Sequence, residues 1–175
     1  IADMKGKKVF LGPPGGGAWN AAYSWTKAVT GLDAKKGDFQ SVKASWSSAF
    51  QGFQDRQFDV YINGGIAPFP QVEQLALTSK IRLLGIDKDQ YGAANAAQKY
   101  LKAVPGRAVG IIAKGSYGSN VEMDHDIYTN SATVGIIVRK SMSDDQVYAM
   151  TKAFWDNAAE ATKTTPWLKA ITMDY

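Results

Sequence analysis

Short apolar runs alternate with longer amphipathic stretches along the first two thirds of the chain. A short apolar run bounded by glycine, proline or asparagine is typical of a buried strand, whereas apolar residues at helical spacing indicate a helix. Runs of the first kind predict strands at residues 9–11, 39–43, 59–62, 81–86 and 108–113. The stretches between them predict helices at residues 18–29, 46–54, 68–78 and 87–104.

The pattern changes after the fifth of these strands. An acidic, irregular stretch covers residues 122–126, and β-branched residues at 131–138 predict a further strand. The sequence Ser143-Asp144-Asp145-Gln146 is a capping box that opens a helix over about residues 144–161. Pro166 begins a last short helix. The inward face of the long helix is predicted to hold Val147, Met150, Phe154 and Ala158.

The repeated order of strand and helix is the signature of an α/β domain. We therefore expect a mostly parallel, five-stranded sheet with helices on both faces. Ser45 or Ser47 is the expected cap of the second helix, because a serine hydroxyl accepts a hydrogen bond from the first turn.

Composition narrows the possible chemistry. The chain has 175 residues, about one average domain, of which 45% are hydrophobic and 21% charged, so it is expected to fold. The absence of cysteine excludes disulfides, thiolate zinc sites and cysteine nucleophiles, and the one histidine, His125, excludes any site that needs two. The net charge of +4 suits an anionic partner, but the basic residues are dispersed and no nucleic-acid-binding motif occurs, so we expect no nucleic-acid partner.

The glycine-rich segment 12–17 (GPPGGG) stands between the first predicted strand and helix, where nucleotide-binding loops stand. Ala18 and Trp19 replace the lysine and the hydroxyl residue that such loops need, which argues against an NTPase. Backbone N–H groups at a helix N-terminus still favour an anion such as a carboxylate or phosphate. The alternative is a tight turn without a ligand.

Three other loops, at residues 45–48, 63–65 and 115–118, follow predicted strands and are expected at the same edge of the sheet, where ligands of open α/β sheets bind. The alternative is that these glycines serve only as turn residues. The predicted ligand-binding residues are Gly15, Gly16, Gly17, Ala18, Trp19, Ser45, Trp46, Asn63, Gly64, Gly65, Ser116 and Tyr117.

The sequence gives little support for a metal site or a catalytic site. Glu122, Asp124, His125 and Asp126 could suggest a metal cluster, but we interpret them as a solvated loop. A Ser-His-Asp triad lacks its G-x-S-x-G elbow. We therefore predict no catalytic residue, no metal and no cofactor.

Residues 3–17 resemble the opening DLKGKRV-x-x-GPPGSGT of the solute receptors of TAXI-type TRAP transporters. The resemblance spans nearly the whole chain in the family's order. It continues at residues 58–61, Gly64-Gly65, 81–84, 113–117, 134–139 and 145–153.

This resemblance implies a receptor with two α/β lobes of the type II periplasmic-binding-protein kind. Such receptors capture a small organic anion, a dicarboxylate or acidic amino acid, and deliver it to the membrane components of a TRAP transporter without catalysis. It implies a periplasmic location, with a signal peptide in the full-length protein. Residues 1–120 would be the ligand-binding lobe, and residues 121–175 a return segment that packs toward the other, missing lobe.

The sequence departs from the family pattern in the glycine loop. Gly15, Gly16, Gly17 and Ala18 stand where the family has Gly-Ser-Gly-Thr, so two hydroxyls are lost while the backbone N–H groups remain. An enzyme on a related two-lobe scaffold, acting on a phosphorylated or pyrimidine precursor, is the alternative function. It would need a general base or nucleophile, and the loops offer neither histidine nor cysteine. A third alternative is an interaction module whose glycine loops are only turns.

The return segment would leave apolar surface uncovered in this chain. We expect it either to fold back onto its own lobe or to be covered by a second copy in a dimer. The apolar residues concerned are Val134, Ile136, Val138, Val147, Met150, Phe154 and Trp167.

Overall fold

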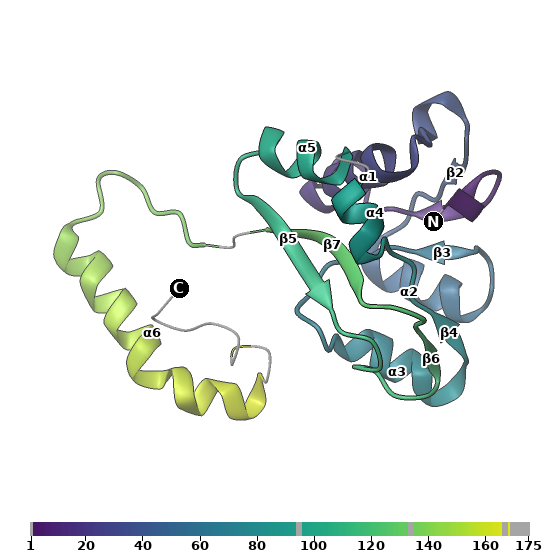
Figure 1. Ribbon diagram of the computed structural model, residues 1–175. Coiled ribbons are helices and arrows are strands. Elements are labelled where there is room, and N and C mark those ends of the chain that lie inside the picture. The colour runs from purple at the N-terminus through teal and green to yellow at the C-terminus, as the bar shows by residue number, and fades with distance from the viewer. Residues whose placement is uncertain (1, 94–95, 133–134, 166–167, 169–175) are drawn as a thin grey trace. The chain divides into compact units, whose positions relative to one another are not determined.

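The computed structural model describes residues 2–93, 96–132, 135–165 and 168. The chain divides into two compact units, Ile1–Thr133 and Val134–Tyr175. Figure 1 shows that, among the described residues, the strands belong to the first unit, whereas the second unit contains one long helix. The assignment of residues after 120 to a return segment stays a prediction.

The first unit contains a three-stranded parallel sheet. It consists of β1 (Lys8–Phe10), β2 (Gln40–Ser41) and β3 (Val60–Tyr61) in the order β2-β1-β3. Val9 lies opposite Ser41 on one side and Val60 on the other. All three strands run in one direction, so their carboxyl ends meet at one edge of the sheet.

Helices follow each of these strands, as the sequence pattern predicts. They are α1 (Gly17–Thr30), α2 (Trp46–Gln54) and α3 (Pro70–Thr78). Short 3-10 helices cover Ala2–Met4 (η1) and Ala34–Lys36 (η2). The single helix predicted at residues 87–104 is described as two, α4 (Lys88–Ala93) and α5 (Ala96–Ala103).

The predicted five-stranded, mostly parallel sheet is wrong. The remaining strands of the first unit form two small sheets instead. β4 (Ile81–Arg82) pairs in parallel with β6 (Val121–Glu122), a strand too short to give a sequence pattern. β5 (Arg107–Ile112) pairs antiparallel with β7 (Ile127–Ala132), and the two run side by side in Figure 1. A parallel partner would need a long crossover, whereas the chain returns from β5 to β7 without an intervening helix.

The strand predicted at residues 131–138 is also misplaced. The observed strand, β7, begins at Ile127 and ends at Ala132, because its register is fixed by the pairing of Ile112 with Ile127. Gly135–Val138 is not a strand, and the side chains of Ile136 and Ile137 are 83% and 98% exposed. Val134 lies outside the described residues.

Two apolar clusters bury β1 from opposite sides. Val9 and Leu11 pack with Met4 and Phe39 on the side covered by α1. Phe10 packs with Ala49 and Phe58 on the side covered by α2, and its ring lies 5.4 Å from the rings of both Trp46 and Tyr61. Successive strand residues point to opposite faces, so helices are needed on both. A third cluster of Ala76, Val121, Met123 and Ile127 joins α3 to the smaller sheets.

A buried carboxylate fixes the segment that follows α1. Asp33 is 4% exposed and accepts hydrogen bonds from the Tyr23 hydroxyl at 2.7 Å and the Lys35 amide at 2.9 Å. The Lys27 ammonium lies 2.8 Å from its second oxygen. The bond with Lys27, followed by that with Tyr23, holds the pKa of the Asp33 carboxyl well below its usual value.

The second unit contains α6 (Asp144–Thr164). The predicted capping box is confirmed, because the Gln146 amide donates to Ser143 Oγ and the Ser143 amide donates to Gln146 Oε1. None of the helix residues is buried, and Met150 and Phe154 are 49% and 40% exposed. The predicted last helix begins at Pro166, which with Trp167 lies outside the described residues.

Within the described part of the chain, no helix is both long enough and apolar enough to cross a lipid bilayer.

Replacing Asp33 with Asn keeps the shape of this side chain but removes its charge. The pKa of the folded carboxyl lies below the value of about 4 expected when unfolded, so its stabilising effect is complete above about pH 4 and is lost as the pH falls below that value. We therefore expect Asp33→Asn to lower the midpoint of thermal unfolding at neutral pH. The difference from the wild type should shrink in acid, as circular dichroism melts across this range would show.

The matched control is Asp89→Asn, because Asp89 is an exposed aspartate of the same unit. Its midpoint should follow that of the wild type at every pH. A deficit of the Asp33 variant that stays constant from neutral to acidic pH would contradict a role for the Asp33 charge.

Candidate functional site

The carboxyl ends of β1, β2 and β3 lead into three loops at one edge of the parallel sheet. We call this edge the rim and define it as residues 12–19, 45–48 and 63–69. Each of these segments runs into the N-terminus of a helix, namely α1, α2 or α3. Parallel pairing thus brings together three of the four loops that the sequence singled out, and the fourth follows β5 of a different sheet.

The glycine loop shapes the start of α1. Gly12 has φ +116°, and a Cβ added there would lie 3.0 Å from the Trp19 backbone nitrogen, so a side chain at this position would be strained. Gly16 is the N-cap of α1 and offers no side-chain cap. The first N–H groups of a helix have no intrahelical partner. Those of Gly17, Ala18 and Trp19 are therefore donors at the positive end of a 14-residue helix.

The Trp19 ring is held beside α1 rather than free at the rim. Its Nε1 donates to Ser41 Oγ at 3.3 Å, and its ring stacks on Tyr23 with centroids 5.0 Å apart. The Lys35 ammonium lies 4.9 Å from the centroid of the Tyr23 ring and 5.9 Å from that of Trp19. Trp19 therefore contributes its backbone N–H to the rim, while its ring fixes the first turn of α1 against β2.

The second rim segment is a cluster of serines. Ser45 caps α2 by accepting a hydrogen bond from the Ser48 amide at 3.2 Å, as predicted. Its hydroxyl also lies 3.2 Å from that of Ser47 and 2.9 Å from that of Ser48. The loop at residues 45–48 was predicted to lie at this edge, and Ser47 and Ser48 are exposed there beside Ser45. The Trp46 ring meets Phe10 edge-on at 5.4 Å and so belongs to the apolar core.

Asn63 organises the third rim segment. Its Nδ2 donates to the Tyr61 hydroxyl at 2.9 Å and to Gln71 Oε1 at 2.7 Å, and its Oδ1 accepts from the Gly64 amide at 2.7 Å. Burial raises the pKa of Tyr61, although the bond from Asn63 opposes this shift. The polar groups of Asn63 therefore hold the loop to α3. The sequence pattern did not indicate that Tyr61 and Gln71 would accept hydrogen bonds from Asn63.

The fourth loop, Gly115–Gly118, touches the third. The Tyr117 hydroxyl accepts a hydrogen bond from the Phe69 amide at 2.9 Å. Burial, the largest influence, raises the pKa of the Tyr117 phenol. Ser116 is exposed, and its amide donates to the Ala113 carbonyl within the turn. Tyr117 thus contacts the rim through Phe69, a residue that the sequence pattern did not single out.

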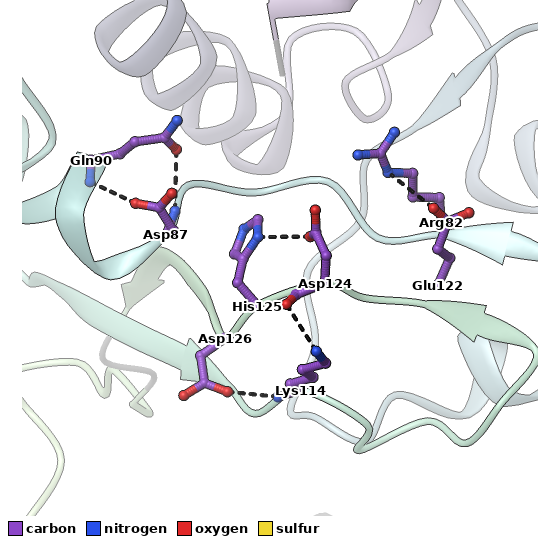
Figure 2. A network of polar contacts seen from close by, with 8 residues as sticks. All are labelled: Arg82, Asp87, Gln90, Lys114, Glu122, Asp124, His125 and Asp126. Atoms are coloured by element: carbon purple, nitrogen blue, oxygen red, sulfur yellow. Dashed lines mark hydrogen bonds and ion pairs between the residues drawn. The ribbon is translucent and has the colours of Figure 1, made fainter.

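The acidic stretch after β6 forms a polar network of its own, shown in Figure 2. His125 Nδ1 lies 2.7 Å from Asp124 Oδ1, and Asp126 accepts from the Lys114 amide at 2.8 Å. The Lys114 ammonium donates to the Asp124 carbonyl at 3.0 Å. Among the residues that the structure describes, no group of three or more histidine, aspartate or glutamate side chains is arranged to hold a metal ion.

Two surface hollows lie in the first unit away from the rim. One, of about 300 Å³, is bordered by Tyr91, Leu101 and Arg107. The other, of about 330 Å³, is bordered by Asp87, His125 and Tyr128. Neither includes a residue of the rim as defined above.

Helices that begin at the carboxyl edge of a parallel sheet are typical of the class of α/β proteins that bind a small ligand at that edge. The sequence model of the NMT1-like family matches residues 1–175. The chain therefore belongs to the NMT1-like family, which is of the periplasmic solute-binding type. A search of curated proteins found no match.

Proposed function

We propose that this chain captures a small organic anion, a dicarboxylate or an acidic amino acid, at the rim. The observation that carries the proposal is the uncapped N-terminus of α1, which lies at a sheet edge shared with two further loops. Membership of a solute-binding-type family supports the same function. In this proposal the chain is a type II receptor of the TAXI kind, works in the periplasm and delivers its ligand to the membrane components of a TRAP transporter.

The rim has no negatively charged side chain that would repel an anion. Residues 12–19, 45–48 and 63–69 contain no aspartate or glutamate, so a carboxylate would meet no like charge there. Gly15 and Gly17 are exposed and have no Cβ, which lets a ligand approach the backbone closely. A carboxylate that accepts hydrogen bonds from backbone N–H groups at a helix N-terminus is favoured by both the bonds and the helix dipole.

We also propose that the rim binds without catalysing a reaction. A nucleophilic serine needs a base within hydrogen-bond reach. The hydroxyl of Ser45 instead meets the Ser48 amide and two other serine hydroxyls. The rim segments contain no histidine, cysteine, aspartate or glutamate that could activate it.

The charge of the proposed ligand can be tested at Gly16, the N-cap of α1. Its φ of −81° is open to any residue, and a Cβ there would meet only the Pro13 carbonyl oxygen, at 3.3 Å. Asp and Asn are both favoured N-caps, so neither should destabilise α1. The negative charge of Gly16→Asp should weaken the binding of L-glutamate and succinate by roughly 1–3 kcal/mol relative to Gly16→Asn. Isothermal titration calorimetry measures the difference.

Gly16→Asn is the matched control, because it adds the same volume and the same capping group without a charge. Thermal melts should give similar midpoints for the two variants. Equal affinities of the two for both anions would contradict an anion site at α1. Failure of the wild-type chain to bind either anion would contradict the proposed ligand class.

The second unit leads to a proposal about assembly. The side chains of Ile136, Ile137 and Tyr148 are 83%, 98% and 68% exposed, and large apolar side chains left this exposed in one unit point to a protein–protein contact. We propose that two copies of the chain cover these residues mutually.

Sedimentation velocity should then show a dimer that dissociates on dilution, and Ile137→Lys should shift the equilibrium toward the monomer. A monomer at all concentrations would refute the proposed dimer.

A further inference from the structure

Two loops from different sheets are joined by one hydrogen bond. The third rim segment, residues 63–69, follows β3 of the parallel sheet, whereas Gly115–Gly118 follows β5 of the antiparallel pair. The Phe69 amide donates to the Tyr117 hydroxyl at 2.9 Å, across 48 residues of sequence. This contact connects the loop of Gly64 and Gly65 to a part of the fold that shares no strand with it.

The loop that carries Tyr117 is held in place by several contacts. Its ring packs against the apolar cluster of Val121, Met123 and Ile127. The start of its loop is held by Lys114, whose amide donates to Asp126 and whose ammonium donates to the Asp124 carbonyl (Figure 2). The turn itself is closed by the Gly118 amide, which donates to the Gly115 carbonyl at 3.1 Å. The hydroxyl is therefore presented from a segment with several independent anchors.

Phe69 is the residue at which the rim loop becomes a helix. It is the N-cap of α3, and its carbonyl accepts from the Val72 amide at 2.9 Å. Its ring fills the space beside Gly65 so closely that a Cβ on Gly65 would overlap it. The position of Phe69 is thereby coupled to the backbone of Gly65. The other end of the segment is tied to α3 through the bond from Asn63 to Gln71.

We propose that Tyr117 is a positioning residue, which holds Phe69, and through it Gly64 and Gly65, in the conformation that meets the ligand. The inference rests on the proposed function of the rim. Glycines lose much conformational freedom when they are ordered, and ordering a loop during binding weakens affinity. A hydroxyl anchored on a packed loop orders the segment before the ligand arrives. This role replaces the direct ligand contact that the sequence analysis predicted for Tyr117.

The test is Tyr117→Phe, which removes only the hydroxyl. Amide hydrogen exchange followed by NMR should become about tenfold faster or more at Phe69, because its N–H loses its acceptor, and should also accelerate at Gly64 and Gly65. Calorimetry with L-glutamate and with succinate should show affinity weakened by roughly three- to tenfold, since the loop must then be ordered during binding. Tyr100→Phe is the matched control, because Tyr100 is a half-buried tyrosine of the same unit that lies against Trp25. It should alter neither exchange in the rim nor affinity.

Gly65→Ala tests the same coupling from the other end. A methyl group there displaces the Phe69 ring, so this variant should also speed exchange at Gly64 and Phe69 and weaken affinity. Both substitutions free the same segment, residues 63–69, from its contacts at Phe69. In the double variant their effects on affinity should therefore be less than multiplicative. Fully multiplicative effects would overturn the proposal.

The remaining outcomes separate this inference from the proposed function. Unchanged exchange at Gly64 and Gly65 in Tyr117→Phe overturns the positioning role, and reduced affinity with unchanged exchange assigns Tyr117 to direct ligand contact instead. Faster exchange with unchanged affinity also overturns it. If the wild-type chain binds neither anion, the proposed ligand class fails, and exchange at these glycines alone decides whether Tyr117 holds the loop.

Discussion

The burial of β1 on both faces is the constraint on which the first unit depends. Val9 and Phe10 are fully buried and point to opposite sides of the sheet, so each needs its own cover. Burying a large apolar side chain is worth about 1.5–3 kcal/mol, which no single polar contact at the rim matches. With α1 over one face and α2 over the other, β1 occupies the centre of the order β2-β1-β3. The shared edge of the rim follows from this parallel arrangement.

The sequence predicted those parts of the fold that depend on local pattern. The helix predicted at residues 46–54 matches α2, and the capping box at Ser143 is present, because caps and helical spacing are set within a few residues. The pairing of strands was not predictable in the same way. β6 has two residues, too few for any periodicity, and the direction of β5 depends on its partner β7 rather than on its own apolar run. The apolar residues at 136–138 resembled a strand, yet pairing ended at Ala132.

The candidate site shows the same division. Loops that end parallel strands could be placed at one edge from the strand order alone, but the roles of their side chains could not. The predicted ligand contacts of Trp19 and Asn63 stay predictions, but the side chains of both residues hold the rim to its surroundings, through Ser41 and Gln71. Those partners are 22 and 8 residues away in the sequence, and nothing in the local pattern indicates the contacts. A polar side chain near a glycine loop can thus serve to hold the loop in place, and not only to bind a ligand.

This support matters for the proposed function, in which the glycine loop offers backbone N–H groups rather than side chains to an anion. Where the TAXI-type receptors that the sequence resembles have hydroxyl residues, this loop has Gly16 and Ala18, so in the proposed function the N–H groups at the start of α1 would supply the hydrogen bonds. Backbone donors bind well only if the backbone is already in place, since glycine resists ordering. The first turn of α1 is fixed by the Trp19 ring, and the loop after β3 by Asn63 and Tyr117. In the proposed function, the glycine loop would therefore select an anion by the geometry of its backbone, which depends on these surrounding side chains remaining in position.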